Sequence, residues 1–298
     1  MLNFKNLEAC IWISKLGSFG AAATRLNTTQ PAISIRVAQL EAELGVKLFD
    51  RTKRAIALTP QGRTLVDYAA RLLRLHDDMM LEIGDPSMTS GVFRLGVSET
   101  IVHTWLPEFL ARMTVNYPTL ALEIDVDISH NLTEKLVGQA LDLCFMLGPI
   151  ALPSIRCQSL CDFPVGFVAS PSLGLGGGRR DFIKIQKWPI LTFARNTLPY
   201  DNVVELLDNQ GLRDQRIYAS ASLATIIRMA LDGIGVAVIP QAIVSKELKT
   251  NSLALLKLPV ALPDLHFFAA WTNTLEHRLT QSIVKIAKKV SKEYELKS

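Results

Sequence analysis

The sequence lacks any long apolar run. Its longest stretch without Asp, Glu, Lys or Arg covers residues 163–178, and these 16 residues include two prolines and five glycines. A membrane-spanning helix needs about 20 consecutive apolar residues. Lys5 and Glu8 interrupt the N-terminal segment and no small-residue cleavage site follows, so a secretory signal is not expected. The sequence therefore predicts a cytoplasmic protein without a membrane segment.

Cysteine is scarce, with four residues in 298, and the only close pair is Cys157 and Cys161. No second pair and no nearby histidine complete a tetrahedral metal site, and the five histidines are scattered. We expect no metal site. Buried structural thiols are the favoured interpretation of the cysteines, and redox sensing is the alternative.

The glycines do not form a cofactor loop. Gly233 and Gly235 are followed by Val238 at the position where a dinucleotide fingerprint requires a third glycine. Neither a phosphate loop nor a nucleophile elbow is present. The sequence thus predicts that the protein is not an enzyme, with no catalytic residue and no cofactor.

Excess charge is confined to the N-terminus. Residues 1–58 contain eight Lys or Arg and four Asp or Glu, whereas the remaining 240 residues contain 24 of each. Hydrophobic residues make up 49% of the chain, which is enough for packed cores, and the length allows two or three domains. A basic first segment on an otherwise neutral chain indicates contact with nucleic acid there.

Residues 1–58 predict a winged helix-turn-helix. A first helix ends at Gly17, a short second helix follows Ser18, and a third begins about three residues after the second, at Pro31. This is the helix-turn-helix spacing, and the N-terminal end of its third helix faces DNA. Two short strands around a basic turn follow and form a wing placed to contact phosphates.

An ordered set of residues between about positions 3 and 65 resembles the DNA-binding domain of LysR-type transcriptional regulators. The set comprises Gly17, Ser18, Phe19, Thr29, Gln30, Pro31, Ala32, Ile33, Ser34, Leu40, Glu41, Leu44, Gly45, Leu48, Phe49, Arg51, Leu58, Thr59, Pro60 and Gly62. The resemblance implies DNA contacts by Ser18, Thr29, Gln30, Pro31, Ser34, Arg36, Arg51, Lys53 and Arg54. Many members carry a basic or polar residue after the serine, whereas this chain has Ile35. That side chain either meets a thymine methyl group or packs internally.

Residues 59–90 predict a linker helix and a hinge. Thr59 and Pro60 can start the helix, and no further proline occurs before Pro86. Residues then alternate steps of four and three, the pattern of a coiled-coil seam, at Leu65, Ala69, Leu72, His76, Met79 and Ile83, all of them apolar except His76. Such a stripe could also cover a core of its own chain. We favour pairing of two chains and predict a homodimer or a homotetramer.

From residue 91 onward, short apolar strands alternate with helical segments, which predicts an α/β domain with mostly parallel sheets. The resemblance, looser here, implies an effector domain of two lobes crossed by two strands, like a periplasmic solute-binding protein. The predicted domains are residues 1–58, 59–90 and 91–298, with lobe I at about 91–162 and 267–298 and lobe II at about 163–266.

Ligands of open α/β sheets bind beyond the carboxyl ends of the strands, where helix amides point outward. The predicted effector residues at such places are Ser98, Thr100, Ser129, Phe193, Arg195 and Ser220. Each hydroxyl could instead be a plain helix cap, and Arg195 could be a solvated surface residue. We expect a small polar or anionic metabolite as effector and double-stranded DNA as partner. A solute-binding receptor without a transcriptional role is the alternative function.

Overall fold

The computed structural model describes residues 3–50, 56–83, 91–175, 182–272 and 278–296. The chain divides into two compact units, Met1–Pro86 and Ser87–Ser298, which are described separately below. The helix predicted as a linker belongs to the first unit. The hinge predicted at residues 84–90 lies outside the described residues, and the domain boundaries given above stay predictions.

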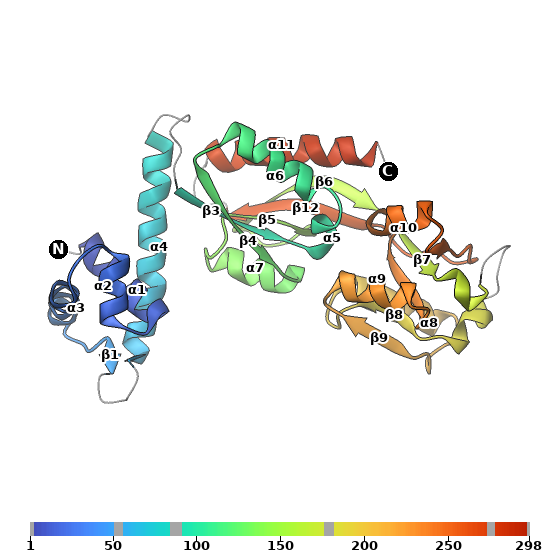
Figure 1. The fold of residues 1–298 in the computed structure, drawn as a ribbon, viewed down its shortest axis with the longest axis horizontal. Helices are drawn as coiled ribbons and strands as arrows, with labels where there is room; N and C mark the ends of the chain where they lie inside the picture. Colours follow the sequence, from blue (N-terminus) through green and yellow to red (C-terminus); the bar gives the residue numbers. More distant parts are fainter. Residues whose placement is uncertain (1–2, 51–55, 84–90, 176–181, 273–277, 297–298) are drawn as a thin grey trace. The chain divides into compact units, whose positions relative to one another are not determined.

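The first unit is the predicted winged helix-turn-helix followed by a long helix (Figure 1). Its elements are α1 (Phe4–Leu16), α2 (Phe19–Arg25), α3 (Gln30–Leu44), β1 (Phe49–Asp50), β2 (Ala57–Leu58) and α4 (Pro60–Ile83). The first three helices begin where a side chain accepts a hydrogen bond from a backbone amide two or three residues on: Asn3, Ser18 and Thr29. Gly17 and Gly45 end α1 and α3 with φ of 65° and 69°, a conformation that glycine adopts at little cost.

Helix α1 is the centre of this unit, since it packs against α2, α3 and α4. Its buried side chains Leu7, Cys10 and Ile13 join Ile33, Val37 and Leu40 of α3 in one apolar core. The two wing strands pair antiparallel, with Phe49 opposite Leu58. The sequence prediction of three helices and a two-stranded wing is confirmed.

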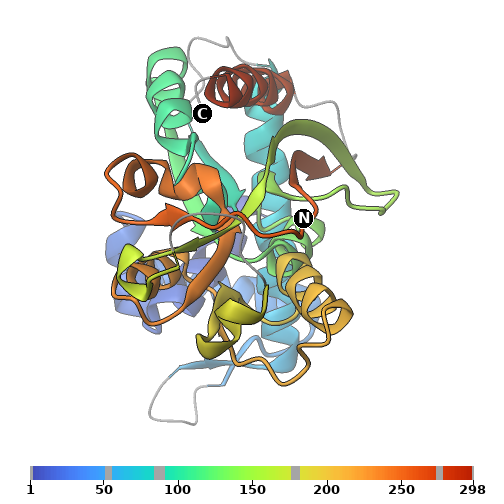
Figure 2. The ribbon, with the colours of Figure 1, turned by 90° about the vertical axis from the view of Figure 1, so that its right-hand side faces the viewer.

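Lobe I of the second unit contains a five-stranded sheet of order β4-β3-β5-β12-β6. The strands are β3 (Gly91–Val97), β4 (Leu120–Val126), β5 (Leu143–Leu147), β6 (Ile155–Phe163) and β12 (Leu265–Thr272). Helices α6 (Leu106–Asn116) and α11 (Arg278–Glu295) lie side by side on one face of the sheet, as Figures 1 and 2 show. Helix α7 (Ser129–Val137) covers the other face, and the short α5 (Glu99–Val102) follows β3.

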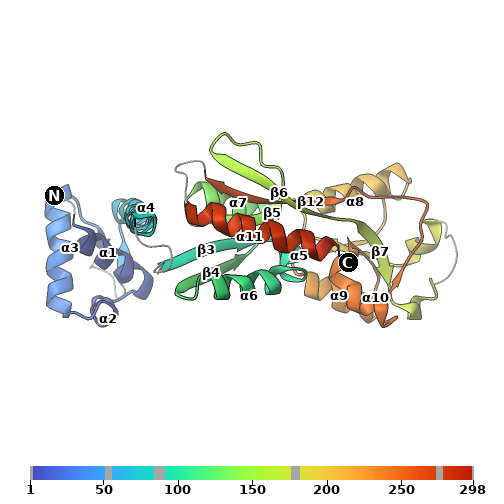
Figure 3. The same cartoon turned by 90° about the horizontal axis from the view of Figure 1, so that it is seen from above.

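Lobe II contains a second five-stranded sheet of order β11-β7-β10-β8-β9. The strands are β7 (Val165–Ala169), β8 (Ile190–Phe193), β9 (Ile217–Ser220), β10 (Val236–Pro240) and β11 (Ala254–Leu255). Helix α8 (Leu198–Asn209) packs on one face and α9 (Leu223–Leu231) on the other (Figure 3). Short helical turns complete the lobe: Pro171–Leu173, Phe182–Lys187, Gln241–Val244 and α10 (Ser245–Lys249).

The two-lobed architecture is confirmed, but the sheets are mixed rather than mostly parallel. Strand β12 runs antiparallel to both β5 and β6, and β7 runs antiparallel to β10. The antiparallel partners arise because the chain leaves lobe I directly from β6 into β7 and returns to it through β12. Within the described residues, no helix has the length and apolar character that crossing a bilayer requires.

Candidate functional site

The N-terminal half of α3 presents an exposed face that no other described element of its unit covers. Ile33, Val37 and Leu40 turn inward, whereas Gln30 and Pro31 are exposed. Ser34 and Arg36 are partly exposed. Ile35 is 57% exposed, so the interpretation that it packs internally is wrong. An apolar side chain on this face is of the kind that contacts a thymine methyl group.

Ser18 and Thr29 serve as helix caps in the structure. The Ser18 hydroxyl accepts from the Ala21 amide at 3.3 Å, and the Thr29 hydroxyl accepts from the Ala32 amide at 3.4 Å. A capping hydroxyl still has its own proton to donate, so the cap does not exclude a phosphate contact. The predicted wing cations Arg51, Lys53 and Arg54 lie outside the described residues.

Leu48, just before the wing, connects α3, the wing and α4 through its backbone. Its amide donates to Glu41 Oε1 at 2.9 Å, and its carbonyl accepts from the Thr59 amide at 3.0 Å. Burial opposes ionisation of Glu41, but hydrogen bonds from Leu48 and Lys47 outweigh it and hold the carboxyl pKa below its ordinary value. These bonds fix the base of the wing against the recognition helix.

Gly62 brings α4 against the same point. A Cβ atom at this position would lie 2.0 Å from the Leu48 carbonyl oxygen, far inside van der Waals contact. The Thr59 hydroxyl donates to the Lys47 carbonyl at 2.7 Å and accepts from the Gly62 amide at 3.0 Å. The first turn of α4 therefore packs tightly against the backbone just before the wing, and only a glycine at position 62 allows this close approach.

The apolar stripe predicted on α4 is divided between two faces of the helix. Leu65 and Ala69 pack against the core of their own unit, and the His76 ring lies 4.9 Å from the ring of Phe4. For Ala69, which is fully buried in its own unit, the favoured interpretation of a seam between chains is wrong, whereas Leu65 and His76 are partly exposed. Leu72 and Met79 are exposed together with Tyr68 and Leu75, which the seam prediction did not include; the exposed fractions lie between 39% and 59%. This exposed stripe is the set Tyr68, Leu72, Leu75 and Met79.

The predicted effector residues gather at the carboxyl ends of strands in both lobes. Ser98 follows β3 and Ser129 follows β4, and these two strands are parallel neighbours in lobe I. In lobe II, Phe193 and Ser220 end the parallel strands β8 and β9 and are directly paired in register. Phe193 also packs against the apolar cores of both lobes, so the two edges approach each other there.

Most of these side chains already have contacts within the protein. The Ser129 hydroxyl accepts from the Leu147 amide at 3.2 Å, and the Ser220 hydroxyl accepts from the Ser222 amide at 3.1 Å. Arg195 is exposed and its guanidinium lies 6.0 Å from the ring of Tyr200. Ser98 and Thr100 differ, because they are 8% and 3% exposed and their hydroxyls have no hydrogen-bond partner among the described residues.

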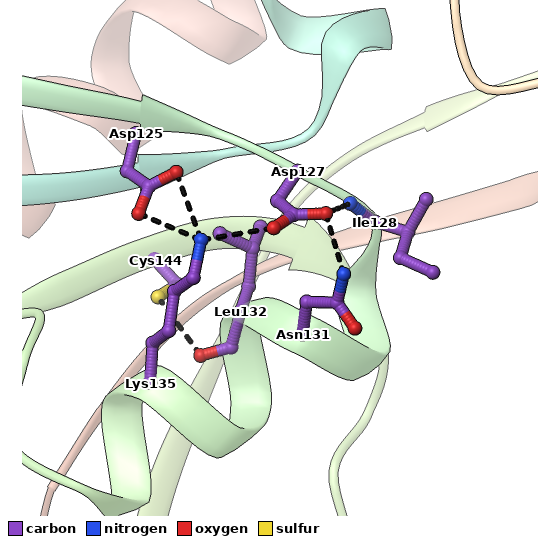
Figure 4. A network of polar contacts seen from close by, with 7 residues as sticks. All are labelled: Asp125, Asp127, Ile128, Asn131, Leu132, Lys135 and Cys144. Carbon is purple, nitrogen blue, oxygen red and sulfur yellow. Dashed lines mark hydrogen bonds and ion pairs between the residues drawn. The ribbon is translucent and has the colours of Figure 1, made fainter.

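A polar network joins the end of β4 to α7, the helix that begins at Ser129 (Figure 4). Lys135 of α7 reaches back to Asp125 at 2.8 Å and to Asp127 at 2.9 Å. Asp127 also accepts from the Ile128 amide and from Asn131, both at 2.8 Å. Burial opposes ionisation of Asp127, but these hydrogen bonds hold its pKa below the ordinary value. The network fixes the start of α7 relative to the end of β4.

Three of the four cysteines are poor candidates for redox chemistry. Burial raises the pKa of Cys10, Cys144 and Cys161 to about 12, whereas a reactive thiol needs a low pKa and access to solvent. Cys157 is partly exposed, and its thiol lies 3.9 Å from the Ile150 carbonyl. Among the described residues, no three His, Cys, Asp or Glu side chains gather where they could hold a metal ion.

Both units match models of one protein family. Residues 4–63 match the bacterial regulatory helix-turn-helix protein, lysR family, and residues 87–290 match the LysR substrate binding domain. The second match alone covers more than half of the chain. The chain belongs to the LysR family of transcriptional regulators. It is therefore a DNA-binding regulator with an effector domain and not an enzyme, and the alternative of a receptor without a transcriptional role is wrong.

Curated relatives and solved structures agree with this membership. The HTH-type transcriptional regulators GltR and YofA of Bacillus subtilis (strain 168) are 27% and 28% identical to this chain, over 85% of its length and 84% and 86% of theirs. Full-length OxyR from Pseudomonas aeruginosa has a TM-score of 0.71 at 22% identity, covering 98% of this chain and 95% of OxyR. CbnR in complex with its target DNA has a TM-score of 0.70 at 19% identity, covering 97% and 100%. These two structures show the same fold.

Two acidic residues of this LysR-family chain escaped the sequence analysis as functional positions. Glu41 was noted only as part of the resemblance, although an acid on the inward face of a helix signals a buried polar contact. Glu99 lies between the two predicted effector residues Ser98 and Thr100, at the first turn of a helix. Its carboxylate reaches the other lobe, where it accepts from the Leu223 amide at 2.7 Å.

Proposed function

We propose that this regulator reads duplex DNA in the cytoplasm with the exposed end of α3 and with the wing, as a homodimer or homotetramer controlled by a small polar or anionic metabolite. The observation that carries the proposal is that the uncovered face of α3 lies in the 58 residues that hold all the excess positive charge. Gln30, Pro31, Ser34 and Arg36 would meet the groove. Ser18 and Thr29 would donate to phosphates, and the wing cations would contact phosphates beside them.

Replacing Arg51, Lys53 and Arg54 with glutamine should weaken binding to every DNA sequence. Each lost phosphate contact should reduce the slope of log affinity against log salt by about 0.9, because fewer counterions are released. Fluorescence anisotropy of the full chain with operator and random duplexes over a series of salt concentrations measures this slope.

A matched control removes three exposed cations of the effector domain, Arg213, Lys246 and Lys249, by the same substitution. This variant loses the same net charge and should keep the wild-type slope. Equal slopes for the wing variant and the wild type would contradict the assignment of the wing to phosphates.

The exposed stripe on α4 supports assembly of two or more chains. Tyr68, Leu72, Leu75 and Met79 recur at steps of four, three and four, which places them along one face of the helix. Exposed apolar surface of this regularity is unfavourable in water and is covered when two such helices pair. A homodimer formed along this stripe would present two recognition helices to an inverted repeat.

A Leu72→Asp variant is expected to shift the protein toward smaller species, because a carboxylate without a partner is costly at a buried position of a helix pair. Sedimentation velocity over a range of protein concentrations measures the shift. Arg63→Asp is the control, since Arg63 is exposed on the same helix but, five residues before Tyr68, faces away from the stripe. Wild-type assembly of the Leu72→Asp variant would show that α4 does not hold the chains together.

The effector proposal is supported by the two buried hydroxyls of Ser98 and Thr100. Buried hydroxyls nearly always have a hydrogen-bond partner, so two of them on either side of Glu99, without a partner among the described residues, suit a place where water or a polar ligand supplies it. Ser129 follows β4, the parallel neighbour of the strand that precedes Ser98, and Phe193 and Ser220 end the neighbouring strands β8 and β9 of the other lobe. In this proposal Arg195, which is exposed, attracts an anionic ligand to the edge of the site.

A further inference from the structure

Glu99 links the two lobes. It is an acidic side chain of lobe I, and it binds the N-terminus of helix α9 in lobe II. Its Oε2 atom accepts from the Leu223 amide at 2.7 Å, and its Oε1 atom lies 3.5 Å from the Ser222 hydroxyl. Leu223 is the first residue of the nine-residue helix α9, and Ser222 is its N-cap. The free amides at a helix N-terminus favour a negative charge, so the carboxylate fits this position in both geometry and sign.

The remaining surroundings of Glu99 hold the side chain in place. Glu99 is 23% exposed, and its Oε1 atom lies 3.6 Å from Nε2 of His103, one turn further along the chain. Two other contacts join the lobes among the described residues: the Tyr294 hydroxyl lies 3.4 Å from the Ala242 carbonyl, and Phe193 packs against both cores. The ionic hydrogen bond of Glu99 is therefore the most directional of these contacts.

We propose that Glu99 is a positioning residue that sets the relative placement of the two lobes by binding the N-terminus of α9. Glu99 lies between Ser98 and Thr100, so the same contact determines how closely α9 approaches the two buried hydroxyls. The inference deepens the proposed function, because it names the residue that fixes the geometry of the effector site. A ligand or substitution that takes the carboxylate away from α9 releases one lobe from the other.

The test is a distance measurement between the lobes in the full chain. Cysteines for the spin labels are introduced by Val115→Cys in α6 and Arg213→Cys after α8, two positions that are 81% exposed, in a Cys157→Ser background. Dilution with unlabelled chain restricts double electron–electron resonance to pairs within one chain. Glu99→Ala should broaden the distance distribution several-fold, whereas Glu108→Ala should leave it unchanged, because Glu108 pairs with Arg112 inside lobe I.

Chemical rescue separates this role from a general loss of structure. Acetate should narrow the distribution of the Glu99→Ala variant again, since a free carboxylate can occupy the vacated amides, whereas chloride at equal ionic strength should not. Glu99→Gln, which keeps the shape and one acceptor oxygen, should give an intermediate width and serves if the alanine variant does not fold. A wild-type distribution in both variants, or broadening that acetate does not reverse, would overturn the proposal. The distance is measured without DNA and without a metabolite, so failure of the proposed function would be seen separately, in the DNA-binding measurements.

Discussion

Replacing Gly62 with alanine is expected to destabilise the N-terminal unit by about 1–3 kcal/mol, the usual cost of overpacking a tight contact. The added methyl group would meet the Leu48 carbonyl oxygen at 2.0 Å and Leu58 Cδ2 at 3.1 Å. The carbonyl cannot turn away freely, because it accepts from the Thr59 amide. Each kcal/mol lowers the Tm of a unit of this size by about 4–8 °C. Thermal unfolding followed by circular dichroism measures the loss, and operator affinity should fall with it.

Gly20→Ala is the matched control in the same unit. A Cβ atom at Gly20 would lie 3.6 Å from Gln30 Oε1 and 3.7 Å from the Ser18 hydroxyl, which is ordinary contact distance. Alanine inside a helix is favoured over glycine by roughly 0.5–1 kcal/mol, so this variant should be as stable as the wild type or more stable. Equal melting temperatures for the two variants would mean that α4 does not approach the wing as closely as described.

A Glu41→Ala variant is expected to cost about 1–3 kcal/mol for each buried amide that it leaves unpaired. The Leu48 amide loses its acceptor at 2.9 Å, and the Phe49 amide loses the same carboxylate. Both residues are almost fully buried, so water does not replace the bond at low cost. Urea denaturation measures the difference, with Glu43→Ala as control because Glu43 is an exposed acid on the same helix. A smaller effect at Glu41 than at Glu43 would contradict the description of the wing base.

The lowered pKa of Glu41 also predicts a pH dependence. A carboxyl whose pKa is lower in the folded than in the unfolded protein stabilises the fold above its ordinary value of 4.5. That contribution is lost as the pH falls through the lowered folded value. Glu41→Gln should therefore be less stable than the wild type near neutrality and lose less stability on acidification. Urea denaturation at a series of pH values measures this difference. If the free energy of unfolding fell equally with pH in both proteins, Glu41 would not be ionised in the folded state.

Local signals predicted most of the elements of this protein. The helix-turn-helix followed from Gly17, Ser18 and Pro31, because caps and first-turn prolines act within a few residues. The alternation of strands and helices from residue 91 onward was predicted because strands such as β8 are short buried runs between turn residues. The candidate site residues at strand ends were predicted for the same reason, because the strands that precede them can be recognised from their own sequence.

Features that depend on distant residues were not predictable. Strand β6 was missed because its buried residues do not alternate and its pairing with β12 contains an irregularity at Phe267 and Phe268. The seam on α4 was assigned as one stripe, and only the packing of α1 shows that Ala69 faces inward. Glu99 escaped notice because its partner, Leu223, is 124 residues away. In each case the deciding contact is tertiary, and sequence periodicity carries no record of it.

Helix α4 carries the wing contact at Gly62 near its start, core contacts at Ala69, and the exposed stripe from Tyr68 to Met79. Its 24 residues span ~36 Å at about 1.5 Å per residue. In a dimer built on this stripe, the distance between the two α3 helices would therefore be fixed by the continuous helix α4 of each chain. An extra base pair between the half-sites moves one half-site along the duplex and rotates it about the axis. Two α3 helices at a fixed distance cannot follow that change. The operators of this protein would then tolerate changes in the sequence of the spacer far more readily than changes in its length.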